Sequence, residues 1–113
     1  MQTWNLHEIE APDGRRDPVV LHSGDEGRAV MIRLDPGQQL GDHQVKEHSF
    51  VVVLDGSVRI GSGEDAVEAG AGTLARFEPD ERREISSPDG ARLLMLLSPW
   101  PGVGHYRGGD APA

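Results

Sequence analysis

The sequence contains no cysteine, which excludes disulfide bonds and zinc sites built from thiolates. It also contains no apolar run close to the roughly 20 residues that a membrane-spanning helix needs. Its start, MQTWNLHEIE, lacks the basic and then apolar segments of a signal peptide. These absences predict a soluble, cytoplasmic protein with no membrane partner.

Basic residues are few and are almost all arginine. The chain of 113 residues has 19 acidic residues against 11 basic ones, a formal net charge of −8, and Lys46 is its only lysine. A negative charge of this size opposes binding to nucleic acid and to anionic membranes. The length predicts one domain. The preference for arginine, together with abundant Gly, Ala and Asp, is typical of a bacterial genome rich in G and C.

Turn-forming residues punctuate the chain at short, regular intervals. Clusters of Gly, Pro and Asp, which reverse the chain readily, separate runs of about four to eight residues. This spacing predicts an all-β, antiparallel sandwich or barrel. No window longer than ten residues shows a 3.6-residue apolar period, so we expect negligible helix. The expected strands cover residues 18–22, 28–34, 49–54, 57–60, 73–77, 83–87 and 91–97.

Two of these runs, FVVVL at 50–54 and LLMLL at 93–97, are apolar at every position. Both faces of each strand therefore need a cover. A barrel this small buries only one face, which predicts a two-fold homodimer that covers the other.

Two turn signals flank the run SVRI at 57–60. Asp55-Gly56 predicts a tight type I′ hairpin, because Asp and Gly accept the positive φ angles that this turn requires. The stretch GSG at 61–63 predicts a second hairpin turn. In SVRI, alternation places Val58 and Ile60 on one face of the strand.

Two stretches of the chain resemble the two sequence motifs of the cupin superfamily. The first motif is approximately G-x5-H-x-H-x3-4-E-x6-G; Gly37 and Gly56 match its outer glycines, and His43 matches its first metal-binding histidine. The second motif, G-x5-P-x-G-x2-H-x3-N, is similar to the stretch from Gly72, with Pro79 one residue late. The chain thus resembles a small single-domain cupin.

The resemblance extends from about Arg28 to Pro99. It implies an antiparallel jelly-roll barrel, the double-stranded β-helix, of a kind that commonly pairs through sheet surfaces. On this basis residues 1–26 form strands and loops that lead into the barrel, residues 27–100 form the cupin barrel, and residues 101–113 form a C-terminal loop and a disordered tail.

Most of the cupin metal ligands are replaced in this chain. Within an extended segment His43 and Glu47 point to one face, so these two are the candidate metal ligands, with His48 or His105 as a third donor. Imidazole and carboxylate suit Zn, Fe, Mn or Ni. The remaining motif positions, where the cupin pattern has His, Glu, His and Asn, are occupied by Val45, Ser49, Arg83 and Ser87.

A pocket without metal is the alternative. A guanidinium at a ligand position would repel a divalent cation, and it can hold a carboxylate through its two-donor fork instead. The ligand would then be a small, anionic molecule, with no cofactor. The residues predicted to line this pocket are His43, Val45, Ser49, Phe77 and Arg83.

Three functions follow and stay open at this point. The first is a cupin of unassigned activity that binds a small, anionic ligand and is metal-free or weakly metallated. The second is a metal-dependent dioxygenase, isomerase or decarboxylase that acts on a small organic acid. The third is a non-catalytic regulatory or interaction module.

Overall fold

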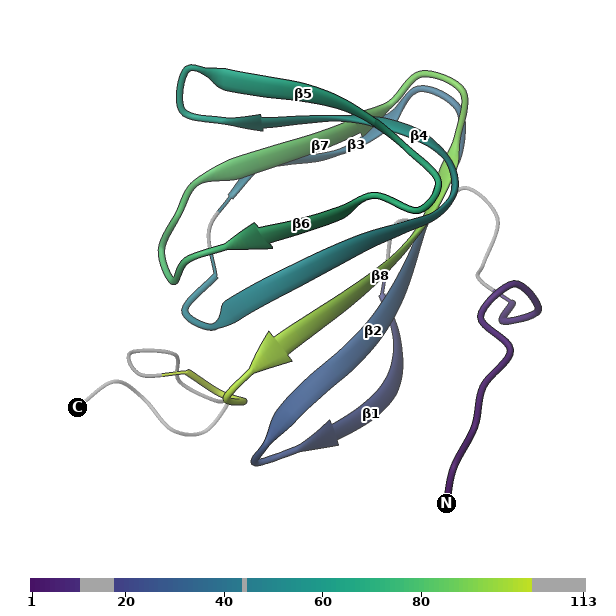
Figure 1. Cartoon of the computed structure of the whole chain (residues 1–113), viewed down its shortest axis with the longest axis vertical. Helices are drawn as coiled ribbons and strands as arrows, with labels where there is room; N and C mark the ends of the chain where they lie inside the picture. Colours follow the sequence, from purple (N-terminus) through teal and green to yellow (C-terminus); the bar gives the residue numbers. More distant parts are fainter. Residues whose placement is uncertain (11–17, 44, 103–113) are drawn as a thin grey trace.

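The computed structural model describes residues 1–10, 18–43 and 45–102, and of Asp42 and His43 it describes the backbone alone. Within these residues there is no helix, as predicted, and eight strands form a curled antiparallel sheet (Figure 1). Accordingly, no described segment is a helix long and apolar enough to cross a membrane. The strands are β1 (Val19–Gly24), β2 (Gly27–Leu34), β3 (Gln38–His43), β4 (His48–Ser62), β5 (Asp65–Gly70), β6 (Leu74–Phe77), β7 (Arg83–Ser87) and β8 (Ala91–Ser98).

Strand β4 joins the two layers of the barrel. The hydrogen-bonded order is β1-β2-β8-β4-β7-β3, and β5 and β6 both pair with β4. The first half of β4 pairs with β6 and β8, whereas its second half pairs with β5 and β7. One layer therefore contains β1, β2, β8 and β6, and the other contains β3, β7 and β5 (Figure 1). This arrangement confirms the predicted all-β antiparallel barrel.

The hairpin predicted at Asp55-Gly56 is wrong. Strand β4 runs through these residues without reversing, and its register with β8 shifts between Val53 and Asp55. Gly56 has a positive φ of 79°, but here this conformation bends the strand from one layer into the other, as β-bulges do. The hairpin lies instead at the predicted GSG turn, where Ser62 pairs with Asp65.

Strands β3 and β5 have no apolar run that would predict them. Among the described strands β3 (QQLGDH) pairs with β7 alone, and β5 (DAVEAG) buries Ala69 alone among its six residues. Both strands lie at an edge of their layer, where one side of the strand and one of its faces stay open. Backbone hydrogen bonds place β3 and β5 in the sheet, and a pattern of side chains in the sequence does not predict such bonds.

The core lies between the two layers. In β8 the odd-numbered residues are buried, and in β4 the buried set changes from odd to even numbers across the bulge, so that Val58 and Ile60 share the core face as predicted. The core consists of Val30, Ile32, Leu34, Val51, Val53, Val58, Ile60, Ala69, Phe77, Ile85, Ala91, Leu93, Met95 and Leu97.

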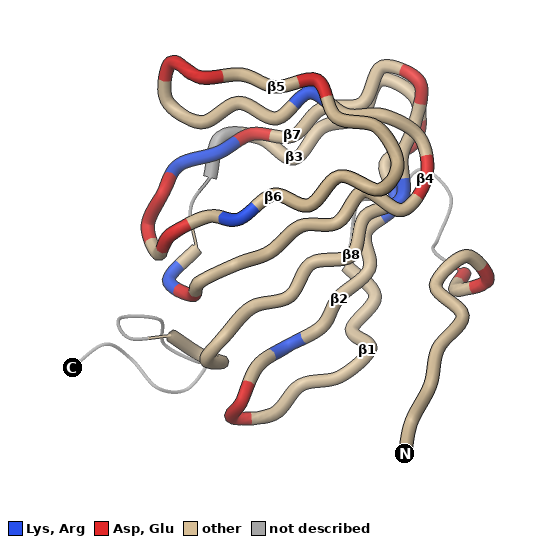
Figure 2. The backbone as a smooth tube through the Cα atoms, in the orientation of Figure 1, with Lys and Arg blue, Asp and Glu red and all other residues tan. Residues whose placement is uncertain are grey.

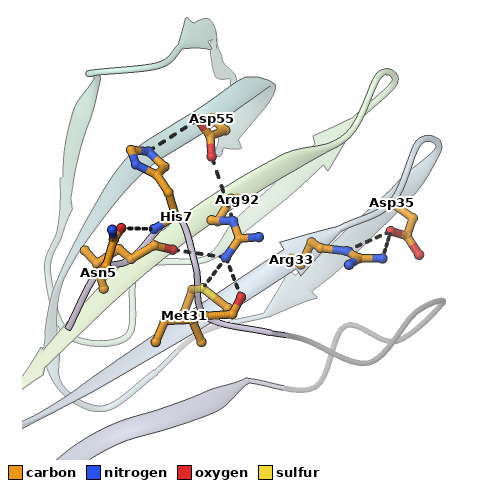
Figure 3. Close-up of polar contacts among 9 residues, drawn as sticks. Asn5, His7, Met31, Arg33, Asp35, Asp55 and Arg92 are labelled. Carbon is orange, nitrogen blue, oxygen red and sulfur yellow. Dashed lines mark hydrogen bonds and ion pairs between the residues drawn. The ribbon is translucent and has the colours of Figure 1, made fainter.

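The N-terminal segment covers one end of the outer face of the β2–β8 layer (Figure 3). Arg92 Nη1, on the outer face of β8, donates to the backbone oxygens of Leu6 (3.0 Å) and Ile9 (2.6 Å). His7 Nε2 lies 3.3 Å from Asp55 Oδ1. These contacts explain why Met31, which points to the outer face, is fully buried.

The other end of this outer face is apolar and exposed. Phe50 and Leu96 lie opposite each other on β4 and β8, with 37% and 40% of their surfaces exposed, and Leu74 on β6 is 60% exposed. Val52, between them, pairs with both Leu74 and Leu94. We call Phe50, Val52, Leu74, Leu94 and Leu96 the outer apolar patch.

Candidate functional site

One end of the barrel collects the β1–β2, β3–β4 and β6–β7 connections and the chain after β8 (Figure 1). Hydrogen bonds join these loops: Asp80 N–H donates to Val45 O at 2.7 Å, and Trp100 N–H donates to Asp25 O at 3.4 Å. Lys46 Nζ also donates to Asp80 Oδ1 at 2.7 Å. We call this end the loop end.

Charged residues of both signs alternate along the loop end (Figure 2). Ser62 Oγ donates to Glu81 Oε2 at 2.6 Å, and Glu78 N–H donates to Glu81 Oε1 at 3.0 Å. The hydrogen bond from Ser62 is the largest cause, and that from the Glu78 backbone the next, of a pKa of Glu81 that lies below its ordinary value. The hydrogen bonds to the Glu81 carboxylate stabilise the fold fully above the ordinary carboxyl pKa. This stabilisation is lost as the pH falls through the lowered pKa of Glu81. The β4–β5 and β6–β7 turns are therefore joined most firmly near neutral pH.

Arg83 begins β7 at the loop end and points into the barrel. Alternation in β7 exposes Glu84 and buries Arg83 and Ile85, and only 1% of the Arg83 surface is exposed. Its Nη1 donates to Ser49 Oγ on β4 at 2.8 Å, and its Nη2 donates to Met95 Sδ on β8 at 3.6 Å. The guanidinium carbon lies 4.7 Å from the ring centroid of Phe77. Arg83 thus reaches across the core from one layer to the other.

The guanidinium of Arg83 has no charged partner in contact. Among the described residues it forms no ion pair, and its buried Nε has no hydrogen-bond partner. Burial lowers the pKa of Arg83 below its ordinary value, and the charge of Glu81 partly opposes this shift. Buried charges in proteins are normally paired, because an isolated one loses its hydration without compensation. The site therefore holds a cation with unused hydrogen-bonding capacity.

The structure brings together three of the predicted pocket residues, Ser49, Phe77 and Arg83. Val45 is half-buried and packs against the core from the β3–β4 connection. The backbone of His43 pairs with that of Arg83, which places it in the adjacent strand, but its side chain lies outside the described residues. The predicted pocket is therefore a set of neighbours around the inner end of β7.

Glu47 is buried, with 1% of its surface exposed, and Gly102 N–H donates to its Oε2 at 2.7 Å. The inward direction of Glu47 is the one that alternation predicts. His48 is exposed on the opposite side, 3.5 Å from Glu78 Oε2, so the structure does not bring it beside Glu47. His105 lies outside the described residues.

Among the side chains that the structure describes, no three His, Asp or Glu residues form a group that could hold a metal ion. Glu47 supplies one suitable carboxylate, and Ser49 and Arg83 replace carboxylate and imidazole donors of the cupin pattern. Because the other two candidate ligands, His43 and His105, lie outside the described side chains, the metal site stays a prediction.

A hollow of about 260 Å³ lies beside the start of β7, lined by Gly61, Gly63, Arg82, Arg83 and Glu84. Glu84 and Gly61 face away from the core in their strands, so this hollow lies on the outer side of the layer. We therefore place the candidate site inside the barrel and not in this hollow.

A second inward arginine, Arg28, was not among the predicted site residues. Val30, Ile32 and Leu34 face the core from β2, and alternation places Arg28 on the same face at the loop end. Its guanidinium carbon lies 4.4 Å from the ring centroid of Trp100, which itself packs against the core. The alternation of apolar residues in RAVMIRL could have identified Arg28 from the sequence, because Arg28 lies two residues before Val30 and therefore on the same face.

Comparison with known proteins gives the fold. No protein-family model and no curated protein sequence matches this chain. Among solved structures, an RmlC-like cupin protein from Desulfovibrio desulfuricans is 20% identical, with a TM-score of 0.78 over 88% of this chain and 97% of that one. An uncharacterized protein with a double-stranded β-helix domain from Klebsiella pneumoniae is 16% identical, with a TM-score of 0.77 over 88% and 90%.

A cupin superfamily protein from Desulfitobacterium hafniense is 12% identical, with a TM-score of 0.73 over 80% of this chain and 83% of that one. These likenesses confirm the resemblance to small cupins at the level of fold: the chain is a small cupin-fold protein, built as a double-stranded β-helix. At such identities they transfer no activity and no ligand.

Proposed function

We propose that this cupin-fold protein binds a small anionic molecule inside the barrel, with Arg83 as the residue that recognises the anion. The observation behind the proposal is that Arg83 lies in the core with 1% of its surface exposed and has no ion-pair partner among the described residues. An anion supplied by a ligand would compensate the buried charge. No reaction is assigned, because the described side chains around Arg83 include no nucleophile paired with a base.

The hydrogen-bond donors of Arg83 support this proposal. A guanidinium has five N–H donors, of which one is directed to Ser49 and one to Met95. The donor on Nε is buried without a partner. A carboxylate accepts two parallel N–H bonds from such a fork, so an anionic ligand would use donors that the protein itself leaves available.

Replacing Arg83 by glutamine tests the proposal. Isothermal titration calorimetry against a panel of inorganic phosphate, sulfate, and mono- and dicarboxylic acids is expected to find at least one ligand of the wild-type protein. Loss of a buried charge-assisted hydrogen bond costs roughly 1.5 to 3 kcal/mol, so Arg83→Gln should raise its Kd by about 10- to 100-fold.

Arg59→Gln is the matched control, because Arg59 is exposed and already paired with Glu68 at 2.9 Å. It should leave the ligand affinity unchanged. Equal affinity for wild-type and Arg83→Gln proteins, or no binding by the wild-type protein, would contradict the proposal.

The metal-dependent enzyme is the second candidate, and the buried carboxylate of Glu47 is the observation that favours it. Metal analysis of protein purified without an affinity tag separates the two. The proposal above expects well under one metal ion per chain. Stoichiometric Zn, Fe, Mn or Ni that is lost on His43→Ala would favour the enzyme instead.

We also propose that a second copy of the chain covers the outer apolar patch. The patch is a row of neighbouring uncharged side chains on β4, β6 and β8. Two copies, each with a formal charge of −8, repel each other elsewhere, and contact at an uncharged surface keeps that repulsion small. A two-fold pair would bury the same patch from both sides.

Leu96→Glu tests this pairing. Light scattering after size exclusion is expected to give a dimer mass for the wild-type protein and a monomer mass for the variant at micromolar concentration, because the new carboxylate would be buried without a partner. Val67→Glu, at a 57% exposed position on β5 outside the patch, should remain dimeric. A monomeric wild-type protein would contradict the pairing.

A further inference from the structure

We infer that Arg28 is a second recognition residue of the same site, and that the ligand is a short dicarboxylate. The inference rests on the proposed function, since it takes Arg83 as the first anion-binding group. Its evidence is independent, because it comes from the other layer of the barrel and from the chain after β8.

Arg28 resembles Arg83 in three respects. Both guanidinium groups extend from the core face of a strand at the loop end, and each lies over an aromatic ring, that of Trp100 or that of Phe77. Such stacking holds the plane of a guanidinium and leaves its edge donors available. Among the described residues neither arginine forms an ion pair.

This lack of ion pairs stands out in so acidic a chain, which has 19 acidic and 11 basic residues. Arg33, Arg59 and Arg76 each pair with a nearby carboxylate on the outside of the barrel. Because acidic residues are in excess, an arginine that faces solvent readily finds a carboxylate partner. Arg28 and Arg83, which face inward, form no ion pair within the described residues. Two arginines at one end of the barrel, neither of them ion-paired within the described part of the chain, match a ligand with two negative charges.

The strand register places the two positions close together. Across one layer, Arg28 pairs with Leu97, Leu97 pairs with Ser49, and Ser49 pairs with Phe77. Ser49 and Phe77 in this row are the residues that hold the guanidinium of Arg83. Arg28 lies two strands from Ser49, a backbone separation of roughly 10 Å.

That separation limits the length of the ligand. Each carboxylate carbon lies about 4 Å from the guanidinium carbon it pairs with, given N–H···O distances near 2.9 Å. We take the spacing of the two guanidinium groups to be about that of the backbone positions from which Arg28 and Ser49 extend, roughly 10 Å, which leaves a few ångströms between the two carboxylates. This spacing fits a chain of about three to five carbons and excludes long diacids.

Isothermal titration calorimetry with malonate, succinate, glutarate and adipate, and with propionate and butyrate as monocarboxylates, tests the inference. The wild-type protein should bind a short dicarboxylate at least about tenfold more tightly than the monocarboxylate of equal length, and adipate less well. Arg28→Gln should abolish this preference and leave monocarboxylate affinity within about twofold. Arg28→Lys, which keeps the charge, should retain part of the preference.

The outcomes separate the two proposals. If Arg83→Gln weakens every acid while Arg28→Gln changes neither class, the assignment of Arg28 is wrong and the anion site at Arg83 stands. If Arg28→Gln weakens both classes equally, the effect is general and the dicarboxylate assignment is likewise wrong. If no carboxylic acid binds the wild-type protein, the dicarboxylate assignment is wrong, and the proposed function fails as well when phosphate and sulfate do not bind either. If Arg83→Gln has no effect on the anions that do bind, the proposed function is wrong.

Discussion

Replacing Arg83 with methionine is expected to raise the free energy of unfolding by about 1 to 3 kcal/mol. The guanidinium is buried among Ser49, Phe77 and Met95 with no ion-pair partner among the described residues. Methionine has a similar length and no charge, so its burial avoids the desolvation that lowers the pKa of Arg83. Its thioether can also contact the Phe77 ring as the guanidinium does.

Urea unfolding monitored by circular dichroism measures this change, and the ligand panel should show no binding to the same variant. Arg59→Met is the control for removing an exposed arginine, and we expect it to change the free energy of unfolding by no more than about 0.5 kcal/mol. A protein that becomes more stable when it loses its ligand affinity would indicate that Arg83 is retained for function at the expense of stability. A loss of stability of several kcal/mol in Arg83→Met would mean that the guanidinium serves the fold.

The direction of the site's side chains could be predicted from the sequence, because side chains alternate between the two faces of a strand. This alternation places Glu47 and Ser49 inward and His48 outward, and the structure has this arrangement. The same rule, applied to the start of β7, puts Arg83 in the core. Side-chain direction depends only on local backbone geometry, so it follows from a short stretch of sequence once the strand is identified.

The partners of these side chains could not be predicted in the same way. Gly102 N–H, which donates to Glu47, belongs to the chain beyond β8, and the Trp100 ring under Arg28 comes from the same segment. A Cβ added at Gly102 would lie 2.5 Å from Lys46 O, so this approach depends on how the end of the barrel closes. No pattern within either stretch reports such a tertiary contact.

The course of β4 shows the same limit at the level of the fold. Asp55-Gly56 has the residue types of a type I′ hairpin, yet Val53 and Asp55 flank a shift of register within one long strand. A positive φ at Gly56 serves a bulge as well as a turn. The choice between them is made by β8, whose Ala91 pairs with Gly56.

Gly56→Ala is therefore expected to lower the free energy of unfolding by about 2 to 5 kcal/mol. An L-residue at a φ of 79° costs about 1 to 2 kcal/mol. The added Cβ would also overlap the carbonyl oxygen of Gly90 and lie 2.9 Å from Cα of Ala91. Because these neighbours are backbone atoms of a paired strand, they can move only by distorting the β4–β8 ladder, which adds about 1 to 3 kcal/mol.

Gly63→Ala separates the two contributions. Gly63 has a similar positive φ of 61°, and a Cβ added there would meet nothing within 4 Å. This variant should lose only the conformational part, about 1 to 2 kcal/mol, when urea unfolding curves of the three proteins are compared. Equal losses at the two positions would mean that the Cβ at Gly56 is accommodated, and that the chain near the bulge can separate from the β7–β8 turn without cost. A loss at Gly56 well above that at Gly63 would establish close backbone packing, and not φ alone, as the reason why β4 needs glycine where it crosses from one layer to the other.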